Sequence, residues 1–216
     1  MASGSTTAGT HVLHGALVAV SALLGVVAGC SNSPPAFESP NIDAAAATEK
    51  AFELYDKNGD LQLDEQELTA CPGVLAVVSE YDAAGDKQIS KDEMIARIEE
   101  WSESPPMMSL DCRVTLAGRP LAGATVAFDP EPYLADDLPP ARGVTNASGS
   151  AAIGIPADKL DRRHRGVVAF NPGVYKIRIT HPEIQVPAKY NEQTTLGLEM
   201  SMQTRPAVLQ LELSRD

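Results

Sequence analysis

Hydrophobic and polar positions change their period once along this chain, near residue 105. Before that point apolar residues recur three or four positions apart, as Met94, Ile98 and Trp101 do, which predicts amphipathic helices. After it, apolar and polar residues alternate, which predicts strands that bury one face. The pattern indicates an α+β chain of two domains, a small all-α domain over residues 41–104 and an all-β sandwich domain over residues 109–216.

An apolar segment from Ala16 to Ala28 precedes both parts. It is too short to cross a bilayer and long enough for the core of a signal peptide. It ends in Val27-Ala28-Gly29-Cys30, which resembles the lipobox of bacterial lipoproteins, where the chain is cut before the cysteine and Cys30 becomes lipid-linked. The alternative is an ordinary secretory signal with an incidental Cys30.

The lipobox resemblance sets the expected location of the protein. Residues 1–29 would be a signal peptide, and residues 30–40, rich in Ser and Pro, a flexible tether. The mature protein would then be extracytoplasmic and anchored to the membrane of the bacterial cell envelope through lipid on Cys30.

Oxygen-bearing side chains alternate after the first predicted helix. The twelve residues from Asp56 to Glu67 resemble the calcium loop of an EF-hand, whose ligands come from positions 1, 3, 5, 7, 9 and 12. Leu61 stands at position 6 in place of the usual glycine, and a positive φ there costs about 1 kcal/mol. We therefore expect weak Ca²⁺ binding, the alternative being an acidic, solvated helix-turn-helix. The implied ligands are Asp56, Asn58, Asp60, Gln62, Asp64 and Glu67.

A second stretch, Asp82 to Glu93, repeats the spacing with fewer ligands. Ala84 removes the position 3 ligand, and Lys87 adds a positive charge at position 6. Leu63 and Ile89 both occupy position 8, through which paired EF-hand loops contact each other. The second loop is expected to be either a weaker site or a partner that binds no metal. Its ligands would be Asp82, Asp86, Gln88, Ser90 and Glu93.

Charge divides the chain at the same place as the hydrophobic period. Residues 43–104 hold sixteen acidic against five basic side chains, a net charge of −11, whereas residues 105–216 hold twelve of each. Nearly all of the chain's net charge of −12 therefore belongs to the predicted EF-hand pair. Such a surface disfavours nucleic acid as a partner and favours a cation.

Alternation over 110–116 and 124–128, with turn residues between them, predicts an antiparallel hairpin. Turn signals separate several more short apolar runs, and about eight strands of this kind are typical of a β-sandwich. The further predicted strands are 141–145, 151–155, 167–170, 174–180, 195–200 and 207–213.

Four segments of this half carry a resemblance to a known family. They are Leu116 to Phe128, Gly143 to Gly149, Gly173 to Thr180, and Pro187 to Gly197. Together they resemble the carboxypeptidase regulatory-like, transthyretin-like sandwich, in the version common in small bacterial lipoproteins. The resemblance implies an accessory, adhesive or carbohydrate-associated module, with an unidentified envelope protein or carbohydrate as its partner.

Catalytic patterns are weak in this half. Transthyretin-like hydroxyisourate hydrolases end in Tyr-Arg-Gly-Ser, whereas this chain ends in Leu213-Ser214-Arg215-Asp216. His181 and the run Asp161 to Arg165 are interpreted as a strand-end residue and a solvated basic loop. The sequence favours a non-enzymatic structural or adhesive module. The alternative is an enzyme or accessory subunit with its site on the sandwich, which a polar cleft between the loops after Phe128 and before Val167 would favour.

Two further cysteines leave two interpretations open. Cys71 ends the first loop-and-helix segment, and Cys112 lies in the first predicted strand of the sandwich. Outside the cytoplasm a disulfide between them would persist and join the two parts. Alternatively, Cys112 faces inward with its apolar neighbours, and both residues are buried free thiols.

Overall fold

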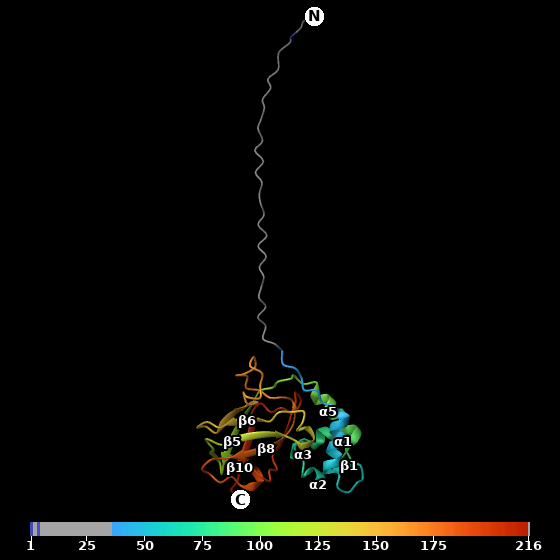
Figure 1. The fold of residues 1–216 in the computed structure, drawn as a ribbon, viewed down its shortest axis with the longest axis vertical. Helices are drawn as coiled ribbons and strands as arrows, with labels where there is room; N and C mark the ends of the chain where they lie inside the picture. The colour runs from blue at the N-terminus through green and yellow to red at the C-terminus, as the bar shows by residue number, and fades with distance from the viewer. Residues whose placement is uncertain (2–3, 5–35, 216) are drawn as a thin grey trace. The chain divides into compact units, whose positions relative to one another are not determined.

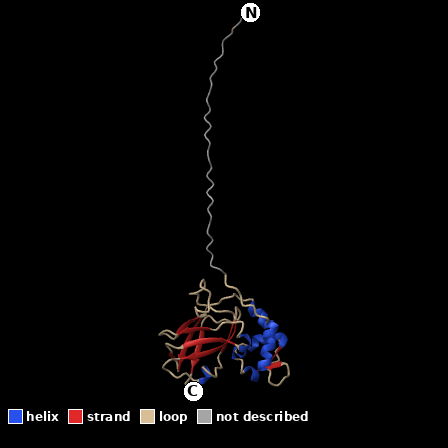
Figure 2. Cartoon of the chain, in the orientation of Figure 1, coloured by secondary structure: helices blue, strands red, loops and turns tan. Residues whose placement is uncertain are grey.

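The computed structural model describes Met1, Gly4 and residues 36–215. The predicted signal peptide, Cys30 and most of the tether lie outside the described residues. Residues Pro34–Asp216 form one compact unit that contains both helices and sheets, as the α+β pattern predicts (Figures 1 and 2). Within the described part of the chain, no helix has the length and apolar character needed to cross a membrane.

The helical part begins with α1, at the place the sequence predicts. Asp43 caps this helix, because its carboxylate accepts the backbone N–H of Ala46 at 3.0 Å and so satisfies one of the free donors of the first turn. Helix α1 buries Ala51, Phe52 and Tyr55 at three- and four-residue spacing. The helices are α1 (Ala44–Tyr55), α2 (Glu65–Leu68), α3 (Pro72–Leu75), α4 (Val78–Tyr81) and α5 (Lys91–Ser102).

Two four-stranded sheets form the second part. In one sheet β3 lies parallel to β10 and antiparallel to β4 and β7. The other sheet has the order β6-β5-β8-β9 and is antiparallel throughout. The first sheet contains β3 (Leu110–Leu116), β4 (Arg119–Pro120), β7 (Ser150–Ile153) and β10 (Leu209–Leu213), and the second β5 (Thr125–Pro130), β6 (Ala141–Val144), β8 (Gly173–Thr180) and β9 (Gly197–Met200).

The predicted hairpin between the first two long strands is wrong. Strand β3 lies in one sheet and β5 in the other, so the chain crosses between the sheets after β4. Alternation identified both strands correctly, since Val114 of β3 and Val126 of β5 are both fully buried. It could not choose their partners, because the inner faces of both sheets are equally apolar. The predicted strand over 167–170 is also wrong, since that segment forms only an isolated bridge from Phe170 to Met108.

The helices pack directly on the second sheet. A side-chain carbon added to Gly197 of β9 would lie 2.0 Å from the carbonyl oxygen of Pro72 in α3. No real carbon tolerates that distance, so this close approach of helix to strand requires glycine. A second contact is ionic, because Arg97 of α5 donates to Glu199 of β9 through Nη2–Oε1 at 2.6 Å, with both side chains buried. Helices and sandwich therefore share a continuous core.

Candidate cation site

Two short strands hold the two acidic loops back to back. Strand β1 (Gln62–Asp64) pairs antiparallel with β2 (Gln88–Ser90), and Leu63 lies directly opposite Ile89. Both side chains are buried, at 1% and 0% exposure. This is the contact that the sequence predicts between the two position 8 residues, and it fixes the register of one loop against the other.

The backbone of the two loops is the same at positions 4 and 6. Gly59 and Gly85 have φ of 76° and 74°, and Leu61 and Lys87 have φ of 65° and 67°. The first pair are glycines and adopt this region freely, whereas the second pair carry a β-carbon that crowds the following carbonyl oxygen. The strain expected at position 6 is therefore present in both loops, at about 1 kcal/mol per residue.

Side chains of the first loop accept hydrogen bonds from the backbone N–H groups of the same loop. The Asp56 carboxylate accepts the N–H groups of Gly59 at 2.7 Å and Leu61 at 3.1 Å. Asp60 and Asn58 form similar turns, in which Asp60 accepts the N–H of Gln62 at 2.9 Å and the Asn58 amide oxygen accepts the N–H of Asp60 at 2.8 Å. Such local side-chain-to-backbone bonds stabilise turns in place of a helix.

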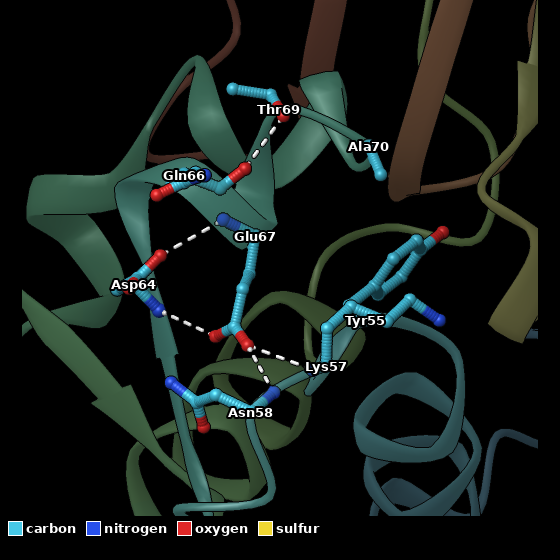
Figure 3. Close-up of a pocket in the computed structure, with 8 residues that line it drawn as sticks. All are labelled: Tyr55, Lys57, Asn58, Asp64, Gln66, Glu67, Thr69 and Ala70. Atoms are coloured by element: carbon cyan, nitrogen blue, oxygen red, sulfur yellow. Dashed lines mark hydrogen bonds between the residues drawn. The ribbon is translucent and has the colours of Figure 1, made fainter.

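Glu67 closes the mouth of this loop (Figure 3). One carboxylate oxygen accepts the N–H groups of Lys57 at 2.8 Å and Asn58 at 3.2 Å, and the other accepts the N–H of Asp64 at 3.2 Å. In return the Asp64 carboxylate accepts the N–H of Glu67 at 2.9 Å, which completes a capping box at the start of α2. Positions 1, 9 and 12 are thus held by backbone donors of one small loop.

The second loop repeats these bonds with different residues. Asp82 accepts the N–H groups of Gly85 at 2.7 Å and Lys87 at 2.9 Å, as Asp56 does in the first loop. Glu93 accepts the N–H of Ala84 at 3.0 Å and both the N–H and the hydroxyl of Ser90. Burial works to raise the pKa of Glu93, but the hydrogen bonds from Ser90 and Ala84 hold it below its ordinary value. Gln88 donates its N–H to Asp86 at 3.0 Å.

The two loops have oxygen donors suited to a hard cation, but these donors are turned toward backbone N–H groups. Among the described residues, no three Asp, Glu, His or Cys side chains converge as a preassembled metal site. The donor set of carboxylate, amide and carbonyl oxygens fits Ca²⁺ in type. A cation would have to compete with the N–H groups that Asp56 and Glu67 accept, which is a physical reason for weak binding.

A buried carboxylate joins the first loop to the sandwich. Tyr55, the residue before Asp56, lies 3.3 Å from Glu131 through its hydroxyl, and Glu131 also accepts the N–H of Gly73 at 2.8 Å. The Glu131 side chain is fully buried, and the Lys176 ammonium lies 3.4 Å from it. Burial raises the pKa of this carboxyl, while Lys176 and the hydrogen bonds partly offset that rise. The sequence does not point to Glu131, because one acid between two prolines forms no pattern.

A groove lies on the outer face of β5, β6 and β8 in the sandwich. It is lined by Thr125, Ala127 and Asp129 on one strand, with Arg142 and Arg178 on its two neighbours. In register, Ala127 lies between Arg142 and Arg178, and Arg178 forms an ion pair with Asp129. The loop after Phe128 and the segment before Val167 do meet, at a separate hollow. The first loop lines it with Pro139, and the second with Lys159, Asp161, Arg163 and His164, so the polar side chains there come from one loop rather than from both.

Cys71 and Cys112 are both free and buried in this structure. Cys71 precedes α3 near Tyr55 and Glu131, and Cys112 lies on the inner face of β3. The structure therefore has the second of the two arrangements that the sequence left open.

Comparisons of the chain with protein-family models, curated proteins and solved structures found no match. The resemblances to an EF-hand pair and to a transthyretin-like sandwich therefore rest on the residues of this chain alone.

Proposed function

We propose that this protein binds Ca²⁺ through the paired acidic loops and acts as a lipid-anchored, extracytoplasmic structural or adhesive module without catalytic activity. The observation that carries the proposal is the repeated geometry of the two loops. They are identical at five of twelve positions, and they repeat the same backbone also where their residues differ. Leu61 and Lys87 both have positive φ at position 6, and Asn58 and Ala84 at position 3 both donate a backbone N–H to the acid at position 12. Solvated acidic loops without a common role have no physical reason to repeat these features.

The first loop is the stronger of the two proposed sites. It offers Asp56, Asn58 and Asp60 as side-chain ligands, Gln62 through its carbonyl, and Glu67 as the position 12 carboxylate. The second loop lacks a ligand at Ala84 and carries the Lys87 ammonium next to the cation. Strain at position 6 in both loops weakens binding, so we expect a dissociation constant on the order of 10⁻⁴ to 10⁻³ M.

The helices give the bound cation a mechanical role. Calcium would join Asp56 and Glu67 across the loop. Tyr55, the residue before Asp56, donates a hydrogen bond to Glu131 in the sandwich. Ordering the loop would therefore also order the end of α1 against the sandwich. A ligand that binds only the folded state raises stability by mass action, modestly at a few multiples of its dissociation constant.

Thermal unfolding of the full chain tests the calcium part of the proposal. The full chain is required, because α3 and α5 pack on β8 and β9 and the helices have no separate core. Millimolar Ca²⁺ should raise the midpoint of unfolding by a few degrees, and equal Mg²⁺ should raise it less, because Mg²⁺ demands stricter octahedral geometry. Equal shifts for both cations, or none, would contradict a calcium site.

Analysis of the mature N-terminus tests the anchor. If Cys30 is lipidated, the mature chain begins at Cys30 with the mass of thioether-linked lipid, and Cys30→Ala leaves the membrane fraction after a high-salt wash. A mature chain that begins elsewhere and carries no lipid would support the ordinary secretory signal instead.

A further inference from the structure

The loop after β7 concentrates positive charge on an otherwise acidic protein. Residues 158–168, here named the basic loop, carry four basic side chains against Asp158 and Asp161, a net charge of +2 in a chain of net −12. Arg162, Arg163 and Arg165 are exposed. Among the described residues, Arg163 forms a long, exposed ion pair with Asp161 at 3.8 Å, which leaves its charge available to a stronger anion.

Exposed apolar side chains lie beside these arginines. Val167 and Val168, within the basic loop, are 38% and 53% exposed, and Val144 on the neighbouring strand β6 is 63% exposed. The three valines line one hollow together with Leu160. Exposed apolar side chains next to basic ones are typical of surfaces that lie in the headgroup region of a membrane.

The basic loop also contacts the chain that leads to the proposed anchor. Phe37 stacks on His164, with ring centroids 4.0 Å apart and an interplanar angle of 28°. Figure 1 shows the start of the described chain and the basic loop, drawn in orange, at the same end of the folded unit, with β1 toward the opposite end. Phe37 lies seven residues after Cys30, so a lipidated Cys30 would hold the basic loop within about 25 Å of the membrane surface.

We infer that the basic loop is a membrane-contact surface, in which Arg162, Arg163 and Arg165 bind anionic lipid headgroups and Val167 and Val168 enter the interface. The inference rests on the proposed anchor, whose tether lets the arginines approach the membrane to within the distance of about 10 Å over which surface charge attracts them. One acyl chain alone gives marginal membrane binding, and a basic patch is a common second signal. Contact at this end directs the acidic loops away from the negative surface.

Vesicle binding of the full chain with Cys30→Ala, measured in the presence of a chelator, tests this inference without lipidation or calcium. Vesicles of phosphatidylcholine are compared with vesicles that also contain phosphatidylglycerol. We expect tighter binding to the anionic vesicles, and a loss of that preference when salt rises from about 0.1 M to about 1 M. The variant Arg162→Gln/Arg163→Gln/Arg165→Gln should lower binding to anionic vesicles about tenfold or more.

The matched control removes three exposed arginines elsewhere: Arg113→Gln/Arg119→Gln/Arg215→Gln. It changes the net charge equally and should alter binding less than about twofold, if only the basic loop touches lipid. The apolar segment 16–28 is present in every variant, so differences between variants report the loop. An equal loss of binding to anionic vesicles in both variants, or no loss of binding in the basic-loop variant, would overturn the inference.

A fluorescent label gives a second readout that does not depend on removing charge. Cys71 and Cys112 are buried, so a dye reacts selectively with Val168→Cys in the Cys30→Ala chain. On anionic vesicles, quenchers within the bilayer should quench this dye and spare one on Glu65→Cys beside the first acidic loop. Equal quenching would overturn the proposal, and so would loop-dependent binding to a soluble acidic polysaccharide without vesicle binding, which would assign the loop to carbohydrate.

Discussion

Arg97 and Glu199 form a two-bond ion pair in the interior, between helix α5 and strand β9. The guanidinium donates from Nη2 to Oε1 at 2.6 Å and from Nε to Oε2 at 3.2 Å, and the exposures of the two side chains are 4% and 0%. The residues are 102 positions apart in sequence. A buried pair of this kind fixes how helix and sheet meet, although its net contribution to stability over an apolar pair is small.

Replacing one partner of this pair should lower the free energy of unfolding far more than replacing both partners. Arg97→Met leaves the Glu199 carboxylate buried without its partner, and we expect a loss of about 3–5 kcal/mol in the free energy of unfolding. Arg97→Met/Glu199→Met should recover most of that loss. As a control, Lys50→Met breaks the exposed pair with Asp136 and should cost less than about 1 kcal/mol. Denaturant unfolding measures all four proteins, and a double variant no more stable than Arg97→Met would contradict the account.

Glu131 should make stability depend on pH. Burial raises the pKa of this carboxyl in the folded protein, so above the ordinary pKa of about 4.3 the folded state binds more protons than the unfolded state. The contribution of Glu131 to stability is then greatest below that value and falls as pH rises through the raised pKa, by up to about 1.4 kcal/mol per pH unit. Glu131→Gln should abolish this fall. The expected result is a difference in unfolding free energy between variant and unaltered protein that grows with pH, and a constant difference would refute it.

Glycine at position 6 should relieve the strain in the first loop. Leu61→Gly removes the β-carbon at a φ of 65°, and we expect a gain of up to about 1 kcal/mol in stability together with tighter calcium binding. Ala117→Gly is the matched control, since Ala117 has a φ of 50° in a turn of the sandwich. It should raise stability without changing the calcium affinity. If Leu61→Gly leaves calcium affinity unchanged, the strain does not limit binding.

Both internal thiols should be free but unreactive in the folded protein. Burial raises the pKa of Cys112 to about 11 and holds that of Cys71 well above its ordinary value. At pH 8 only about a thousandth of Cys112 would be thiolate even with full solvent access. In the Cys30→Ala chain, alkylation should be slow in the native state and should modify two thiols per chain after denaturation. No reactive thiol after denaturation without reductant would show a disulfide.

The sequence predicted local structure better than it predicted which strands pair and which distant residues meet. The cap at Asp43 follows from short-range spacing, because it depends on residues within one helical turn. The opposition of Leu63 and Ile89, which lie in different loops, was expected from the EF-hand resemblance, in which the two position 8 residues pair. The pairing of β3 and β5 was wrong, since alternation records burial and carries no information about which sheet a strand joins. Glu131 could not be predicted at all, because its role depends on contacts more than fifty residues away.

Calorimetric titration of the full chain with calcium tests the central claim most directly. Glu67→Gln should abolish most of the calcium heat, because it removes half of the bidentate position 12 ligand from the stronger loop. Glu93→Gln should leave the stronger binding event in place, with a dissociation constant on the order of 10⁻⁴ to 10⁻³ M. The opposite ranking of the two variants, or no calcium-dependent heat from the unaltered chain at millimolar calcium, would contradict the proposal that these loops bind Ca²⁺.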